Sequence, residues 1–197
     1  LVKKFLEPES SILDVGCDIG LTVKTLEKNN FYAEGIEISQ VGSRIAKNIT
    51  GINVHNTKLE NFMPDKQFDG LLLLDVLEHL DNPIEVLENC YDVLKKKGYL
   101  FIHTPHHRGL GTRYKKFLHR KGIKKDYKHF GFPAHLYAFD KKSLNQMLKY
   151  SGFQTIHFES WSNQLTRGKL NIFNYVFVKL IKIFTLSDYI VCVAKKN

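Results

Sequence analysis

Two carboxylates and two glycines stand close together directly after a short apolar run, residues 11–15. They form the sequence Asp14-Val-Gly16-Cys-Asp18-Ile-Gly20. Glycine at positions 16 and 20 permits backbone conformations, and a close approach of ligand to backbone, that a Cβ would block. The spacing is not that of the G-x-G-x-x-G dinucleotide fingerprint, and a pyrophosphate-binding turn would not carry a negative charge at Asp18. The stretch therefore indicates a ligand with positive charge and no phosphate, and it disfavours NAD and FAD.

A third carboxylate follows the next apolar run. Glu37 lies 17 residues after Gly20, near the spacing of about 20 at which α/β nucleoside sites place an acid against the ribose hydroxyls. The alternative is that Glu37 only caps the turn that follows it. S-adenosylmethionine, which joins a ribose to a sulfonium and an ammonium group, suits these acidic positions. Leu59 and Glu60 could then supply an apolar wall and a hydrogen-bond acceptor for an adenine.

These side chains need a scaffold that brings strand ends together, and the chain has such a pattern. Short apolar runs alternate with helix-like stretches, as in βαβ units around a parallel sheet. We predict strands at residues 11–15, 31–37, 52–54, 68–75, 99–104, 153–160 and 189–194. We predict helices at residues 21–28, from Ser39 to Ile49, from 81–83 towards Gly98, and from Asp140 to Gly152. Because no linker or repeat interrupts the pattern, residues 1–197 are expected to form a single domain.

The formal charge of +9 is concentrated in one segment. Residues 106–129 hold nine Lys and Arg residues against Asp126 alone, a net charge of +8, so the rest of the chain is close to neutral. We treat residues 106–132 as a basic insert after the fifth predicted strand. Such a run is either a solvated surface or a surface that attracts an anionic partner.

Four motifs in a fixed order resemble those of class I S-adenosylmethionine-dependent methyltransferases, specifically the UbiG/UbiE-like type 11/23 group. They occupy residues 12–20, 35–39, 68–83 and 135–153. The resemblance implies an α/β fold with a Rossmann-like, seven-stranded, mostly parallel sheet, an antiparallel last strand and helices on both faces. It also implies methyl transfer to a small-molecule or lipid- or sugar-linked acceptor, most often at oxygen, with S-adenosylhomocysteine as the product.

The same resemblance implies a set of cofactor-binding residues at the ends of the early strands. They are Asp14, Gly16, Cys17, Asp18, Gly20, Glu37, Ile38, Leu59, Glu60, Asp75, Val76 and Leu77. Two departures from the family stand out. Asp18 occupies a position where family members often have glycine, and the few residues before the first strand leave an N-terminal lid helix absent or cut away.

A hydroxyl acceptor needs a base near the methyl group, and histidine is the commonest such base. Several histidines lie near predicted strand ends, and we select His79 and His106 from a set that also includes His103, His107 and His135. The spacing of Asp75, Glu78 and His79 is i, i+3 and i+4, which could place oxygen and nitrogen ligands for a divalent ion on one face of a turn. A plain scaffold role is favoured over a metal, so no metal ligands are assigned.

Residues 170–186 form an amphipathic segment that is too short and too charged to span a bilayer. It is a helix packed on the domain, a dimer contact, or an interfacial helix that approaches a lipid-linked acceptor. Together with the basic insert, it adds an anionic membrane surface to the candidate partners. Three scattered cysteines without C-x-x-C spacing, and no signal-peptide pattern in residues 1–8, favour a reducing, cytoplasmic location with peripheral membrane association as an option.

Two further functions compete with small-molecule methylation. The basic insert interleaves aromatic residues with its cations, as an RNA methyltransferase or an RNA-binding domain would. Against this, the fourth predicted strand is not followed by the Asn/Asp-Pro-Pro-Tyr/Phe motif that nucleic-acid amino-methyltransferases need. A cofactor-binding pseudoenzyme or partner subunit is the second alternative, since Asp18 departs from the family pattern.

Overall fold

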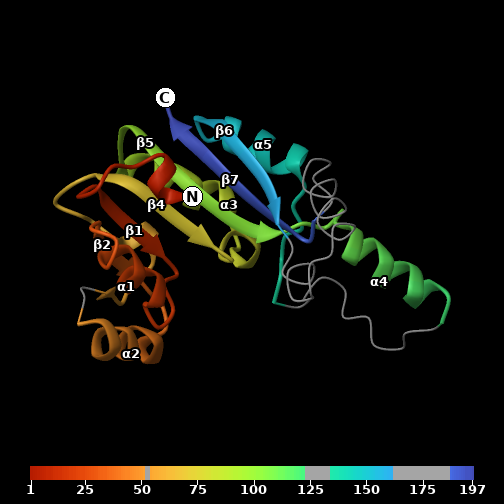
Figure 1. Cartoon of the computed structure of the whole chain (residues 1–197), viewed down its shortest axis with the longest axis horizontal. Helices are drawn as coiled ribbons and strands as arrows, with labels where there is room; N and C mark the ends of the chain where they lie inside the picture. The colour runs from red at the N-terminus through yellow and green to blue at the C-terminus, as the bar shows by residue number, and fades with distance from the viewer. Residues whose placement is uncertain (52–53, 123–133, 162–186) are drawn as a thin grey trace, which may run out of the picture.

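A computed structural model of the chain describes residues 1–51, 54–122, 134–161 and 187–197, and Figure 1 shows their arrangement. A seven-stranded sheet in the order β3-β2-β1-β4-β5-β7-β6 runs through the molecule. Its strands are β1 (Ser11–Val15), β2 (Tyr32–Ile36), β3 (Val54–His55), β4 (Phe68–Leu74), β5 (Leu94–Pro105), β6 (Phe153–Trp161) and β7 (Tyr189–Lys196). β7 is antiparallel to both neighbours, whereas the pairs from β3 to β5 are parallel. The predicted fold class is therefore confirmed.

Four of the five described helices, α4 excepted, cover the two faces of this sheet. The five are α1 (Leu21–Glu27), α2 (Gln40–Thr50), α3 (Pro83–Val93), α4 (Leu110–Arg120) and α5 (Lys141–Tyr150), with three 3-10 turns, η1 (Val2–Lys4), η2 (Leu59–Asn61) and η3 (Leu77–His79). One apolar layer contains side chains from α3 and α5, and the other contains side chains from α1 and α2. Each buried strand feeds both layers. In β4, Leu71 and Leu73 enter the first layer and Leu72 enters the second, which is why this strand is an unbroken leucine run.

Local capping explains where three helices begin, as the sequence predicts. The Ser39 hydroxyl accepts a hydrogen bond from the Gly42 amide at 3.1 Å, and Asn82 caps α3 directly before Pro83. Asp140 forms a reciprocal capping box with Ser143 at the start of α5.

The end of α3 differs from the prediction. The helix was expected to continue towards Gly98, but it ends at Val93 and β5 begins at Leu94. Leu94 pairs with Phe68 of β4, and the register shifts before the next pair. Tertiary pairing with the central strand thus overrides the helical spacing of the apolar residues. Of the third predicted strand, residues 52–53 lie outside the described residues, and the strand is found at Val54–His55.

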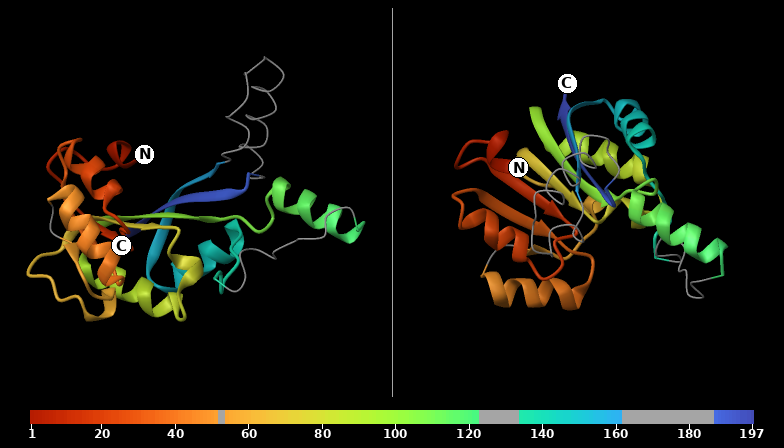
Figure 2. Two further views of the ribbon diagram at one scale, coloured as in Figure 1. Left: turned by 90° about the horizontal axis from the view of Figure 1, so that it is seen from below. Right: turned by 45° about the vertical axis from the view of Figure 1, so that its right-hand side comes forward.

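The basic insert begins with α4, which extends from the carboxyl end of β5 away from the sheet (Figure 2). Residues 106–107 at the start of the insert pair with Phe139, which follows the insert in the chain. His106 forms a β-bridge with Phe139, and the His107 amide donates to the Phe139 carbonyl at 3.0 Å. The amphipathic segment 170–186 lies outside the described residues. Within the part of the chain that is described, no helix has both the length and the apolar character needed to cross a membrane.

Candidate active site

A cavity of about 680 Å³ opens at the carboxyl ends of β1, β2 and β4. Its apolar walls come mainly from these strand ends and from η2, and its polar rim comes from the segment that leads into α3. Four carboxylates line it, those of Glu60, Asp75, Asp81 and Glu85. Lys58 is the one lysine or arginine among its described lining residues. The cavity is of ligand size, and its charge suits a cation.

Half of the predicted cofactor residues line this cavity. They are Gly16, Ile38, Leu59, Glu60, Asp75 and Val76, and the predicted base His79 joins them. The other six are not among the described lining residues: Asp14, Cys17, Asp18, Gly20, Glu37 and Leu77. Of these, Cys17 and Leu77 are buried in the two apolar layers. The lining also includes eight residues that the sequence analysis did not assign to the cofactor site or to the base: Val15, Ile36, Thr57, Lys58, Asn61, Leu80, Glu85 and Val86, together with Asp81 and Asn82 directly before α3.

The turn after β1 forms one wall of the cavity. Gly16 has φ +76°, and a Cβ there would lie 2.7 Å from a methyl group of Val76. The amides of Gly16 and Cys17 both donate to the Ile36 carbonyl, at 2.8 and 3.0 Å. These two hydrogen bonds to the end of β2 hold the turn against the neighbouring strand. Only a residue without a side chain therefore fits at position 16.

Glu37 joins the first turn to the second. One carboxylate oxygen accepts the Asp18 amide at 2.9 Å and the other accepts the Ser39 amide at 2.7 Å. The bond to Ser39 is the local capping interaction that was the alternative to a ribose contact. The two interpretations are compatible, because each carboxylate oxygen can accept a second hydrogen bond. Asp18 itself has φ +49°, a left-handed conformation that glycine adopts more easily.

Asp14 is the most perturbed acid of the site. It is 2% exposed, and burial raises the pKa of its carboxyl to about 7, with the nearby Glu37 as the second cause. Burial together with Asp14 and Glu37 raises the pKa of the Cys17 thiol to about 12. Burial and the neighbouring Glu37 therefore disfavour the ionised form of Asp14, and a bound cation would favour it.

Asp75 and His103 form a pair across the ends of β4 and β5. Asp75 has φ +55°, and its amide donates to the His103 carbonyl at 2.9 Å. The His103 imidazole donates from Nδ1 to the Asp75 carboxylate at 2.8 Å and stacks on the Tyr189 ring. Sequence reasoning named His103 without selecting it, although its register position opposite Leu74 puts it beside the residue that follows β4.

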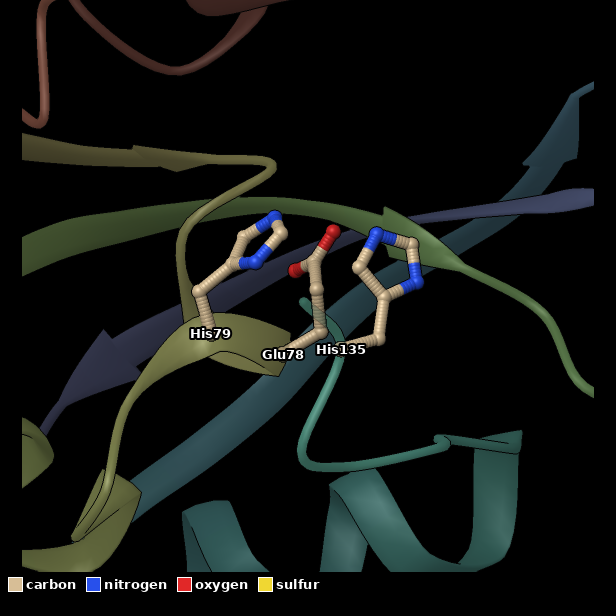
Figure 3. Close-up of side chains that lie close together, drawn as sticks. All are labelled: Glu78, His79 and His135. Atoms are coloured by element: carbon tan, nitrogen blue, oxygen red, sulfur yellow. The ribbon is translucent and has the colours of Figure 1, made fainter. Parts of the chain in front are cut away.

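A second cluster forms on η3. Figure 3 shows the Glu78 carboxylate between the imidazoles of His79 and His135, and ligand atoms of all three lie within 4.8 Å of one another. The Oε2 atom of Glu78 accepts the Thr104 hydroxyl at 3.0 Å, and burial raises the pKa of this carboxyl. Glu78 Oε1 and His135 Nδ1 are buried without a hydrogen-bond partner among the described residues. A shared proton or a divalent ion would satisfy both atoms.

This cluster differs from the predicted set of Asp75, Glu78 and His79. Asp75 faces His103 instead, because its positive φ turns the chain between β4 and η3 and breaks the assumed helical spacing. His135 takes its place from the far end of the basic insert. The His79 imidazole donates from Nδ1 to the Ala134 carbonyl at 2.8 Å, and the amides of residues 136 and 137 donate to the Glu78 carbonyl.

Residues 1–158 match a protein-family model described as a methyltransferase domain. The chain is an S-adenosylmethionine-dependent methyltransferase. A ubiquinone biosynthesis O-methyltransferase from Coxiella burnetii is 28% identical over 178 residues, covering 84% of this chain and 74% of that protein. A mitochondrial protein of the same name from Dictyostelium discoideum is 30% identical over 112 residues, 48% of this chain and 35% of that one.

Solved structures agree on the fold. A methyltransferase from Methanosarcina mazei superposes with a TM-score of 0.72 at 18% identity, covering 99% of this chain and 96% of that one. Magnesium protoporphyrin IX methyltransferase from Synechocystis, solved with bound S-adenosylhomocysteine, gives a TM-score of 0.63 at 14% identity over 96% of this chain and 75% of that one. The family and these neighbours make S-adenosylmethionine the cofactor of this methyltransferase.

The geometry of the methyltransferase cavity fits that cofactor. The cavity has acids on its walls and buried acids next to its lining residues in the chain, as a ligand with sulfonium and ammonium groups requires. The close approach at Gly16 leaves room where a side chain would stand. The Cβ-free turn and two of the four lining carboxylates, Glu60 and Asp75, were predicted from the sequence, whereas Asp81 and Glu85 were not.

The two predicted bases of the methyltransferase have different surroundings. His79 lines the cavity. His106 is buried, its Nδ1 donates to the Ser187 carbonyl at 3.0 Å, and burial lowers its pKa. Because His106 is not among the described lining residues, the structure does not bring the two histidines together at the cavity.

Proposed function

We propose that this methyltransferase acts on a hydroxyl group of a small-molecule acceptor, with His103 as the general base. The observation that carries the proposal is the hydrogen bond from His103, which is not itself among the described lining residues, to the lining residue Asp75. Asp75 lines the cavity, and both side chains reach solvent, with exposed fractions of 54% and 19%. A base that can accept a proton at this place suits a hydroxyl acceptor, which must lose a proton during the transfer. A neutral amine, by contrast, is already nucleophilic.

The hydrogen bond fixes which nitrogen can act. Because Nδ1 of His103 carries the proton that it donates to Asp75, Nε2 is the unprotonated nitrogen of the neutral ring. Nε2 takes the hydroxyl proton, and the Asp75 carboxylate stabilises the imidazolium that forms. S-adenosylmethionine, when bound, supplies an electrophilic methyl carbon: the new O–C bond forms as the S–C bond breaks, and the electron pair stays on sulfur.

The cofactor residues receive roles in the same proposal. Asp14 faces the methionine end, Glu37 accepts the ribose hydroxyls, and Leu59 and Glu60 border the adenine. The buried charge of Asp14 and the position of Leu59 and Glu60 on the cavity wall support these roles. Val76 packs against the turn at Gly16 and shapes the middle of the site.

Relatives support transfer to oxygen, because the matched proteins from Coxiella burnetii are named as O-methyltransferases of ubiquinone biosynthesis. A lipid- or sugar-linked acceptor fits the proposal as a finer class. An anionic membrane surface and a nucleic acid remain lesser alternatives, since the insert supplies cations but the cavity walls are acidic.

Three single variants test the base: His103→Gln, His79→Gln and His106→Gln. Thermal shift with S-adenosylhomocysteine first establishes that each variant still binds the nucleoside. With a panel of hydroxyl acceptors, we expect His103→Gln to lose roughly 10²–10⁴-fold in kcat, and His106→Gln to keep its turnover. Full turnover in His103→Gln, with the loss in His79→Gln instead, would move the base to His79.

A further inference from the structure

A second cavity, of about 580 Å³, lies between α4 and the segment that links it to β5. Three long cations point from one face of the helix, at Arg113, Lys116 and Arg120, and Arg108 closes the other side. Thr112, Phe117 and His107 complete the lining. We call this cavity the α4 groove. It is distinct from the acidic cavity at the ends of β1, β2 and β4, with which it shares no lining residue.

The α4 groove carries an uncompensated positive charge. Arg108 lies 3.2 Å from the Asp140 carboxylate, but Arg113, Lys116 and Arg120 form no ion pair with any described residue. The rest of the insert, and residues 162–186, contain Asp126 as their only acid. Three cations at i, i+3 and i+7 repel one another on one helix face, so a bound anion would stabilise this arrangement.

The shape of the groove selects the kind of anion. A concave space of several hundred Å³ is typical of small-molecule sites, whereas a membrane meets a convex or flat surface. Guanidinium groups bind phosphate oxygens with two parallel hydrogen bonds, and lysine adds a point charge. The Thr112 hydroxyl and the Phe117 ring would contact the less charged part of the same ligand. Phosphate esters and diphosphates match this combination.

The groove also has a definite place relative to the proposed methyl-transfer site. β5 ends at Pro105, two residues after His103, and α4 begins at Leu110 (Figure 1). The carboxyl end of β5 therefore carries the proposed base on one side and leads directly to the groove on the other. An extended acceptor with its phosphate and its hydroxyl at opposite ends suits two sites that follow each other along the chain in this way.

From these observations we infer that the α4 groove binds the phosphate or diphosphate group of the acceptor. The acceptor class is thus a hydroxyl compound that carries a phosphate ester, and this part of the inference rests on the proposed function. The phosphate chemistry is common to free phosphate esters and to lipid headgroups, so the test separates these two sources.

The experiment titrates the full-length protein with inorganic pyrophosphate at 0.15 M salt, by calorimetry. The variant Arg113→Gln/Arg120→Gln removes two cations of the groove. Lys28→Gln/Lys149→Gln removes the same charge from two exposed positions, one directly after α1 and one on α5. We expect one pyrophosphate per chain, affinity at least tenfold weaker in the groove variant, and no change in the control. Absence of binding at millimolar pyrophosphate, or an equal loss in both variants, would overturn the inference.

A second arm distinguishes the source of the phosphate. The same proteins are floated with vesicles of phosphatidylglycerol and of phosphatidylcholine. We expect the groove variant and the wild type to be recovered with phosphatidylglycerol vesicles to the same extent. A different result would overturn the inference: vesicle binding that is lost in the variant without Arg113 and Arg120, and that pyrophosphate does not compete away. That result would assign the groove to a membrane surface.

These outcomes are separable from the proposed function. Pyrophosphate binding needs neither the cofactor nor the proposed base, so His103→Gln keeps it. Conversely, the groove variant keeps the thermal shift with S-adenosylhomocysteine, and with a phosphorylated acceptor its KM rises at least tenfold while kcat is unchanged. Pyrophosphate binding without any hydroxyl methylation would refute the proposed function and leave the anion site standing.

Discussion

The buried Asp14 carboxyl predicts that the affinity for S-adenosylmethionine depends on pH. Its pKa is raised to about 7, chiefly by burial, so a large fraction of the protein without cofactor holds Asp14 protonated at pH 6. A cationic ligand favours the ionised form. Binding must therefore release the proton, and the apparent Kd equals the intrinsic Kd multiplied by 1 + 10^(pKa − pH).

This relation sets the size of the effect. With a pKa of about 7, the factor is about 33 at pH 5.5 and about 2 at pH 7.0, so affinity should rise about 16-fold, or about 1.6 kcal/mol, across this interval. The interval stays below the usual pKa of an α-amino group, about 7.7–8.0, so the ligand's own charge changes little. At pH 6 about 0.9 protons should be released per cofactor bound.

Calorimetry in two buffers of different ionisation enthalpy measures both quantities. Asp14→Asn serves as the comparison, because it keeps the shape of the side chain and cannot titrate. We expect this variant to bind more weakly at pH 7.0 and to show a flat affinity from pH 5.5 to 7.0. A flat wild-type profile, or an equal slope in Asp14→Asn, would refute the assignment of the proton to Asp14.

The remaining predictions concern stability and scaffold. The folded chain keeps the Asp14 proton up to about pH 7, while the unfolded chain loses it near pH 3.8. The free energy of unfolding without cofactor should therefore fall as the pH rises from about 4 to 7. Asp14→Asn should raise this free energy at pH 7.5 by up to about 4 kcal/mol in urea titrations. Gly16→Ala should lose about 1–2 kcal/mol from its positive φ and also lose the thermal shift with S-adenosylhomocysteine, whereas Gly51→Ala, with φ +68° and no neighbouring atom within 4 Å, should lose stability alone. Glu78→Ala leaves the Thr104 hydroxyl without its buried acceptor and should cost about 1–3 kcal/mol by the same measurement, and Glu78→Gln less. Calorimetric titration with Mg²⁺ or Zn²⁺ should give no binding heat, because Glu78 acts as scaffold by accepting the Thr104 hydroxyl; Zn²⁺ stabilisation that Glu78→Gln abolishes would contradict that expectation.

Much of the fold follows from local chemistry that a sequence displays directly. Ser39, Asn82 and Asp140 cap their helices through side chains that reach amides three residues on, so each start is visible from a few neighbouring letters. The turn at Gly16 and Gly20 is similar, because positive φ angles at both positions require glycine or strain. These features place the cofactor site without knowledge of the sheet.

The acceptor side could not be read in this way, because its contacts cross the sheet. Asp75 and His103 meet only because β4 and β5 pair in one particular register, and a bulge near Phe68 sets that register. His135 reaches Glu78 across the whole length of the insert. His106 looked like a strand-end base, yet its ring is buried against the Ser187 carbonyl near the start of β7.

The bridge between His106 and Phe139 has a consequence for the cost of changing the length of the insert. The bridge holds the two ends of the segment between these residues together, so the ends of this segment are already fixed relative to each other. The entropy cost of lengthening a closed loop grows only with the logarithm of its length, about 0.6 kcal/mol for each doubling. This segment can therefore change in length at a small cost in folding free energy, while the rest of the sheet continues to fold as before.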